Sequence, residues 1–232
     1  MTAFANKNFK NITNDEGIFV EILNGAKYPA AMFEISESYG DIEFVGKCWW
    51  GTWFIDAVIP DMDLKKIDEK IKVTFDDREV VLPIQKVTKR NLGLSVCVRT
   101  LYWFVDFPKI VEFIETWKIL GTTHFYFYYQ SVTKEVFAVL REYEKMGIVT
   151  IVKTDFMPKT DNFDPNKALY QMGHTAIYND CLMRTKTKFM ALVDVDEIIL
   201  PQHNQTLLAW LETEAKNDPN RERRHQLNLH IV

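Results

Sequence analysis

Residues 189–201 read Phe-Met-Ala-Leu-Val-Asp-Val-Asp-Glu-Ile-Ile-Leu-Pro: an apolar run, three carboxylates within four residues, and a second apolar run. The first run is short, apolar on both faces and preceded by the polar segment 184–188, a pattern that predicts a buried strand. Because side chains alternate along a strand, we expect Asp194 and Asp196 to point the same way at its carboxyl end.

Two ionised carboxylates aimed at one point repel each other, and a divalent cation removes that repulsion. Mg²⁺ or Mn²⁺ is typically held by one or two carboxylates together with substrate phosphates. The pattern therefore favours a site for Mn²⁺ or Mg²⁺ at Asp194 and Asp196. The alternative is an acidic turn in water, which is how the Asp-Met-Asp at 61–63, next to Pro60, is interpreted.

Composition limits the classes of protein that fit. With 28 basic and 32 acidic residues the net charge is −4, so the chain lacks the basic character of a nucleic-acid-binding protein. No apolar run approaches the roughly 18 residues of a transmembrane helix. The first residues are polar and lack the apolar core of a signal peptide. We therefore expect a soluble chain without its own targeting segment.

Cysteines and glycosylation sequons bear on the compartment. Cys48, Cys97 and Cys181 show no metal-ligand spacing, and their odd number fits either reduced thiols or one disulfide with one thiol left over. Asn11 and Asn204 each begin an Asn-x-Thr sequon, which favours a secretory compartment.

The chain changes character near residue 90. Residues 1–90 contain short apolar or alternating runs separated by Gly, Pro, Asn and Asp, which predicts a β-rich region with antiparallel strands. Within it, the aromatic segment 48–54 is expected to pack in a core or at a domain interface rather than to form a binding surface. Residues 91–232 are interpreted as a second domain.

Strands and helices alternate in residues 91–232. Strands are expected at 94–98, 124–129, 148–152 and 189–193, and helices at 107–120, 133–146, 169–184 and 207–216. Asp106 is placed to cap the first of these helices and Gly121 to end it. The alternation predicts an α/β fold with a largely parallel, Rossmann-like sheet and helices on both faces. Ligands of such sheets bind at the carboxyl ends of the strands, where Asp194 and Asp196 are expected.

Known nucleotide motifs are absent from the sequence. No Gly-x-Gly-x-x-Gly follows the first of these strands, and no phosphate loop ends in Gly-Lys-Ser/Thr, which disfavours a dinucleotide enzyme or an ATPase. Asp180 lies on an apolar helical stripe and therefore needs a partner. Either it pairs with Arg184 one turn later, or it faces a substrate pocket.

With the motifs placed, the sequence resembles glycosyltransferase family 92, a group of metal-dependent sugar transferases with the GT-A fold. The resemblance covers roughly residues 94–210 and consists of several ordered blocks. The blocks are Ser-Val-Cys-Val at 95–98, Val-Glu-Phe-Ile-Glu at 111–115, His-Phe-Tyr-Phe-Tyr at 124–128, Tyr-Glu-Lys-Met-Gly at 143–147, Asn-Asp-Cys-Leu-x-Arg at 179–184 and Ala-Leu-Val-Asp-Val-Asp-Glu at 191–197.

The resemblance implies a GT-A-like domain in which Asp194 and Asp196 hold Mn²⁺ against the diphosphate of a UDP-sugar, with UDP-galactose as the expected donor and a glycan as the acceptor. It also implies inversion at the anomeric carbon, which requires a general base. Donor-site residues implied by the family pattern or by fold analogy are Thr100, Asn179, Asp180, Arg184 and Glu197. A Golgi membrane or lumenal location is implied as well.

The sequence departs from the family pattern in three places. Tyr-Gln at 129–130 stands where the family has an acidic residue, the expected membrane anchor is missing, and the chain ends soon after the metal motif. The domain at 91–232 is therefore interpreted as incomplete at its carboxyl end, and no catalytic base is assigned. The alternative is a truncated donor-fold protein that binds a sugar nucleotide or partner without transfer. A third hypothesis is a cytosolic phosphotransfer enzyme with a two-aspartate metal site.

Overall fold

The computed structural model describes residues 2–6, 17–22, 25–34, 50–60, 63, 69–76, 78–84, 89–157, 159, 161–162, 164, 166, 173–201, 205–217 and 230–231. Contacts within the chain divide it into two units: Met1–Val87 with Met157–Asp180, and Thr88–Phe156 with Cys181–Val232. Within the described ranges, no helix is both long and apolar enough to cross a bilayer.

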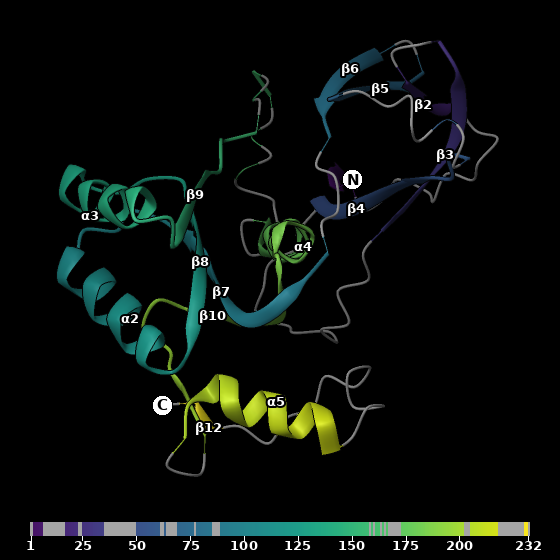
Figure 1. Ribbon diagram of the computed structural model, residues 1–232. Helices are drawn as coiled ribbons and strands as arrows, with labels where there is room; N and C mark the ends of the chain where they lie inside the picture. The colour runs from purple at the N-terminus through teal and green to yellow at the C-terminus, as the bar shows by residue number, and fades with distance from the viewer. Residues whose placement is uncertain are drawn as a thin grey trace, which may run out of the picture. The chain divides into compact units, whose positions relative to one another are not determined.

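The first unit contains a curled antiparallel sheet (Figure 1). Its strands are β1 (Thr2–Asn6), β2 (Ile18–Ile22), β3 (Lys27–Glu34), β4 (Trp50–Ala57), β5 (Lys70–Phe75) and β6 (Arg78–Pro83). They lie in the order β1-β4-β3-β2-β5-β6, and every neighbouring pair is antiparallel. The β-rich character expected for this region is confirmed. The strand expected at 42–45 lies outside the described residues.

Alternation along the strands builds the core of this sheet. In β2, Ile18, Val20 and Ile22 are buried, whereas the residues between them are partly exposed, so one face of the strand points inward. Trp53 of β4 is 1% exposed and packs in the same cluster. For this residue of the aromatic segment, the prediction of core packing is confirmed.

The second unit is built on a four-stranded parallel sheet in the order β10-β7-β8-β9. Its elements are β7 (Asn91–Leu101), α2 (Phe107–Ile119), β8 (Thr122–Tyr129), α3 (Lys134–Lys145), β9 (Val149–Lys153), β10 (Thr187–Val193), β11 (Ile199–Leu200), α5 (Leu207–Asn217) and β12 (His230–Ile231). The short strands β11 and β12 pair antiparallel. Helix α4 (His174–Arg184) contributes its last turn to this unit. The prediction of a parallel sheet is confirmed.

Local signals set the helix ends where the sequence predicts them. The Asp106 carboxylate accepts a hydrogen bond from the Lys109 amide at 3.1 Å and caps α2. Thr133 caps α3 in the same way through the Val136 amide. Gly121 follows α2 with φ +96°, a conformation that favours glycine, and a Cβ there would lie 2.8 Å from Leu208 Cβ of α5. Glycine at this position therefore ends α2 and leaves room for Leu208 of α5.

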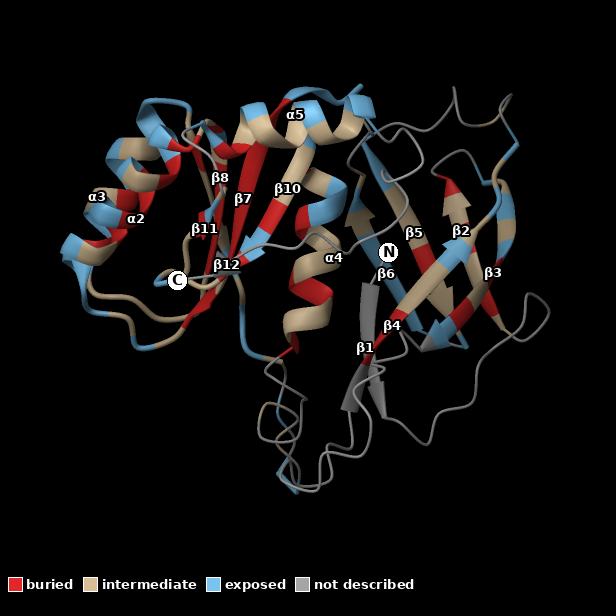
Figure 2. Cartoon of the chain, turned by 90° about the horizontal axis from the view of Figure 1, so that it is seen from below, coloured by how far each residue is buried: buried red, intermediate tan, exposed pale blue. Residues whose placement is uncertain are grey.

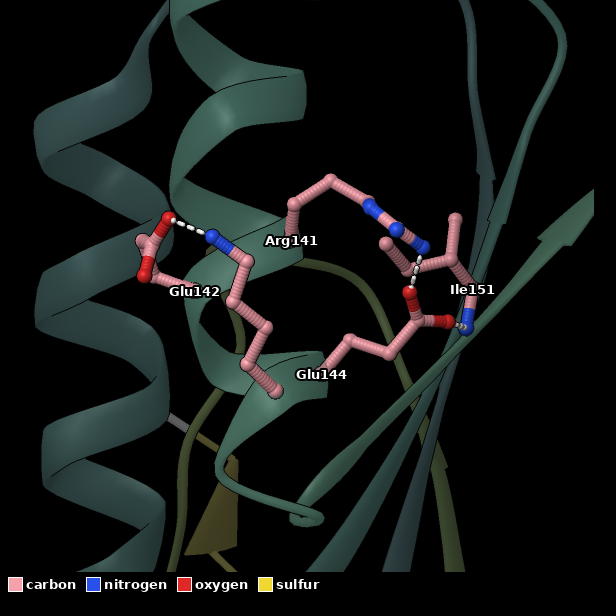
Figure 3. A network of polar contacts seen from close by, with 5 residues as sticks. Arg141, Glu142, Glu144 and Ile151 are labelled. Atoms are coloured by element: carbon pink, nitrogen blue, oxygen red, sulfur yellow. Dashed lines mark hydrogen bonds and ion pairs between the residues drawn. The ribbon is translucent and has the colours of Figure 1, made fainter.

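The core of the second unit lies between the sheet and helices α2 and α3 (Figure 2). Phe113 and Trp117 of α2 and Leu140 of α3 are buried in one cluster with Val96 of β7 and Phe125 of β8. On the outer edge of the sheet, the Ile151 amide of strand β9 donates to Glu144 of α3, which also pairs with Arg141 (Figure 3). This contact satisfies an amide of β9, the edge strand of the four-stranded sheet.

The opposite face of the sheet carries a disulfide. Side chains alternate along β7, so Cys97 points away from the face formed by Val96 and Val98. Cys97 is bonded to Cys181 in the last turn of α4, with the two Cα atoms 6.4 Å apart. The Tyr126 hydroxyl of β8 donates to the carbonyl of Arg184 at 3.1 Å. The structure thus decides the pairing that the sequence left open, and the last turn of α4 covers the face opposite α2 and α3.

Removing the disulfide is expected to destabilise the second unit. The bond joins residues 84 positions apart, and opening a loop of that size costs about 4 kcal/mol in the free energy of unfolding. Cys97→Ser, Cys181→Ser and the double variant should lose equal amounts, because each change breaks the same bond. Urea denaturation of the oxidised protein measures this. If the losses in free energy of unfolding of the two single variants added up in the double variant, the two cysteines would not act as one disulfide.

Candidate functional site

The strand order creates a switch point between β7 and β10. From β7 the chain passes through α2 to β8 and through α3 to β9, always toward the same edge of the sheet. It then returns to place β10 on the other side of β7. In open α/β sheets, ligands bind outside the carboxyl ends of the strands at such a reversal. The carboxyl ends of β7 and β10 therefore define the candidate site.

An ion pair joins these two strand ends. The register places Val193 of β10 opposite Val98 of β7, so the next residues, Asp194 and Arg99, are neighbours. The Nε atom of Arg99 donates to one carboxylate oxygen of Asp194, and a terminal guanidinium nitrogen donates to the other. Such two-pronged pairing is the strongest geometry available to an arginine and a carboxylate. Both side chains stay about one-third exposed, at 32% and 33%.

The pairing of β7 is irregular beside this contact. Val98 pairs with Phe127 of β8 and Leu101 pairs with Tyr129, so β7 has one extra residue between those two positions. Bulges of this kind redirect side chains and occur next to functional sites. Here the irregular stretch contains Arg99 and Thr100.

The two aspartates do not alternate along a strand as the sequence analysis expects. Strand β10 ends at Val193, and Asp194 begins a turn in which the Glu197 amide donates to the Asp194 carbonyl at 3.1 Å. The Asp194 amide in turn donates to the Glu197 carboxylate at 2.8 Å. The strand therefore ends before Asp194, and a turn with reciprocal hydrogen bonds replaces the last strand residues that the sequence predicts.

A hydrogen bond and apolar contacts hold this turn against the core. Trp117 of α2 is fully buried, and its indole nitrogen donates to the Glu197 carbonyl at 3.2 Å. Val195 and Ile198 are partly buried against the same core cluster. Asp196, between the anchored positions, is exposed. The turn thus presents one carboxylate to solvent and one to Arg99.

The available oxygen atoms decide which kind of metal the turn could hold. Within the described ranges, no group of three His, Cys, Asp or Glu side chains is arranged to bind a metal ion. Carboxylates are hard ligands that suit Mn²⁺ and Mg²⁺, and these ions often use only one or two of them plus phosphates and water. Asp194 and Asp196 are therefore oxygen ligands of the kind that fit a cation shared with a phosphorylated ligand.

The other predicted donor-site residues lie at several places. Thr100 is 6% exposed and its hydroxyl oxygen is buried, and burial is the main cause of the raised pKa of Tyr102, two residues later. Arg184 ends α4, and its carbonyl accepts the Tyr126 hydrogen bond. Asn179 and Asp180 also lie on α4 but belong to the first unit, and the Asn179 amide donates to the Thr175 carbonyl at 2.8 Å.

The remaining predictions concern sequons and the first acidic triplet. Asn11 and Asn204 lie outside the described residues, while Thr206 of the second sequon is exposed and accepts a hydrogen bond from the Ala209 amide of α5. Asp63 accepts a hydrogen bond from the Tyr28 hydroxyl at 2.6 Å. This bond is the main cause of the raised pKa of Tyr28. Asp63 is therefore held by a protein partner in the first unit.

Arg99 is the residue that the sequence analysis missed. Its signal was present: a charged residue directly follows the apolar run 94–98, just as Asp194 follows 189–193. The loop after β7 carries a second unusual residue, Trp103, which is 83% exposed and has φ +48°. Its amide donates to the Ser131 hydroxyl at 2.8 Å, which holds the strained backbone in place.

The parallel sheet and its charged strand ends define an α/β protein with a candidate ligand site at the switch point. A profile of glycosyltransferase family 92 matches residues 93–229, which is more than half of the chain. The chain belongs to glycosyltransferase family 92. The matched segment begins in β7 and includes every element of the candidate site.

Three relatives from Caenorhabditis elegans, each named as a glycosyltransferase family 92 protein, are similar to this chain. One is 24% identical over 136 residues, which are 56% of this chain and 27% of that protein. A second is 25% identical over 161 residues, 66% of this chain and 32% of that protein. A third is 29% identical over 97 residues, which are 39% of this chain and 19% of that protein. The chain thus matches about a third or less of the length of each relative.

The reciprocal bonds of the turn give a stability prediction. Glu197→Ala removes the acceptor of the Asp194 amide and should lower the free energy of unfolding by about 1–2 kcal/mol, since a hydrogen bond to a charged group is lost. Glu197→Gln keeps an acceptor oxygen and should lose about half as much.

Urea denaturation compares these variants with the control Glu112→Ala, which removes an exposed carboxylate on α2 and should cost no more than about 0.5 kcal/mol. Equal losses in Glu197→Ala and Glu112→Ala would contradict a structural role for the Glu197 carboxylate.

Proposed function

We propose that the chain is the donor-binding part of a metal-dependent glycosyltransferase with a GT-A-like domain, which uses UDP-galactose to glycosylate a glycan acceptor. The observation that carries this proposal is the position of the Asp194 turn at the switch point of a family 92 chain, beside the carboxyl end of β7. A sugar nucleotide presents a diphosphate, which matches a site that fits a cation shared with phosphates.

In the proposed complex, Asp194 and Asp196 hold Mn²⁺ or Mg²⁺, which supplies Lewis-acid neutralisation of the charge on the leaving diphosphate. Asp196 is exposed and accessible for this role. Glu197 acts on the turn rather than on the ligand, because its carboxylate accepts the Asp194 amide. Trp117 keeps the turn at the strand end through the Glu197 carbonyl.

The proposed reaction forms a bond between an acceptor hydroxyl oxygen and the anomeric carbon of the sugar. The bond from that carbon to the diphosphate breaks, and UDP leaves with the bonding electrons. Inversion requires a general base that takes the hydroxyl proton, and no residue of this chain is assigned to that role. Thr100, Asn179, Asp180 and Arg184 are proposed as donor contacts from the family pattern and fold analogy.

A second candidate is a protein that binds the sugar nucleotide without transferring the sugar. The pairing of Asp194 with Arg99 favours it, because both oxygens of the first aspartate are already engaged. The two candidates differ in turnover: a transferase releases UDP from UDP-galactose in the presence of Mn²⁺ and an acceptor, whereas a binding protein retains the intact donor.

The disulfide supports a secretory location for this activity. Cys97 and Cys181 are bonded on the buried face of the sheet, and stable disulfides form mainly in oxidising compartments. We therefore propose a Golgi membrane or lumenal setting.

The metal role predicts a specific loss of binding. Asp194→Asn and Asp196→Asn should each weaken Mn²⁺-dependent binding of UDP by at least about a hundredfold, because each removes a charged metal ligand. Calorimetric titration of UDP at fixed Mn²⁺ measures the change.

The matched control is Asp155→Asn, which removes an exposed carboxylate just after edge strand β9, about 14 Å from β10 by strand spacing. Wild-type affinity in both Asp194→Asn and Asp196→Asn would contradict the proposed metal site.

A further inference from the structure

Arg99 engages both carboxylate oxygens of Asp194. The guanidinium uses two donors of its planar fork, and both carboxylate oxygens of Asp194 accept from it. A cation that binds Asp194 in this arrangement must first compete with the arginine. We propose that Arg99 exchanges between Asp194 and the diphosphate of the bound nucleotide, so that Asp194 accepts a divalent cation only when a nucleotide takes Arg99. This inference rests on the proposed function.

The exposure of the pair permits such an exchange. Arg99 is 32% and Asp194 33% exposed, so water can solvate both groups after they separate. Separating a fully buried pair would leave two uncompensated charges and would cost far more. The extra residue in β7 between Val98 and Leu101 also frees this stretch from regular pairing with β8. Arg99 therefore lies at a point of the strand that can change its contacts.

The chemistry of arginine fits both partners of the exchange. Its fork matches the geometry of a carboxylate and of a phosphate equally, and it stays charged in either contact. Arg99 lies at the carboxyl end of β7, the side of a parallel sheet where ligands bind. A diphosphate that enters there offers more charge than Asp194 and releases the carboxylate at the same time. Nucleotide and metal binding would then be linked through one side chain.

The proposal makes opposite predictions for metal alone and for nucleotide. In Arg99→Gln the competitor of Mn²⁺ is gone, so Mn²⁺ without nucleotide should bind about tenfold tighter than in the wild type. At saturating Mn²⁺ the same variant should bind UDP about tenfold more weakly, because a phosphate contact is lost. Titration of Mn²⁺ alone, followed by titration of UDP, measures both.

Two controls separate the exchange from a general effect of charge. Arg90→Gln removes a cation before the amino end of β7, about 30 Å of extended chain from Arg99, and should leave both affinities unchanged. In an Asp194→Asn background, Arg99→Gln should no longer tighten Mn²⁺ binding, because the two residues act as one pair. If Arg99→Gln unfolds, Arg99→Lys keeps the charge without the fork and should shift both affinities in the same directions, by less.

The outcomes distinguish this inference from the proposed function. Wild-type protein that binds UDP with Mn²⁺, while Arg99→Gln binds Mn²⁺ alone no tighter than the wild type, overturns the exchange and leaves the donor site intact. Tighter Mn²⁺ binding without weaker UDP binding also overturns it, because Arg99 would then only block the site. Wild-type protein that binds no UDP at all overturns the proposed function itself, and the exchange with it.

Discussion

The parallel pairing of β10 with β7 is the constraint on which the second unit depends. After β9, at one edge of the sheet, the chain returns and places β10 on the free side of β7, which creates the switch point. Its register brings Arg99 beside Asp194, and alternation along β7 directs Cys97 to the face where Cys181 lies. The core, the disulfide and the candidate site therefore share a single pairing between strands that are about 90 residues apart in the chain.

Much of this fold could be predicted from the sequence because its signals are local. Asp106 and Thr133 cap helices through their own first turns, and the apolar run 94–98 lies within a strand. Parallel pairing followed from strand–helix alternation. The placement of the Asp194 turn could not be predicted from the sequence, because the contact that anchors the turn comes from Trp117, 80 residues before Glu197 in the chain. Long-range contacts of this kind leave no periodic signal in the sequence.

The candidate site also combines features with a clear local sequence signal and features without one. Asp194 stands out in the sequence because three carboxylates lie between apolar runs, whereas its partner Arg99 is a single charged residue after an apolar run, which is too weak a signal to indicate a site. The disulfide illustrates a third case, in which cysteine counting left the pairing open and only the geometry of β7 and α4 selected Cys97 with Cys181. Family membership supports the functional interpretation, while the chain matches about a third or less of its relatives' length.

We propose that the carboxyl ends of β7 and β10 together bind a nucleotide diphosphate and a divalent cation. The most direct measurement is calorimetric titration of UDP into the wild-type chain with Mn²⁺ and after its removal by a chelator. We expect saturable binding with Mn²⁺ and binding at least about tenfold weaker without it. A folded chain that binds no UDP in either condition, or binds it equally in both, would contradict a metal-dependent nucleotide site at these strand ends.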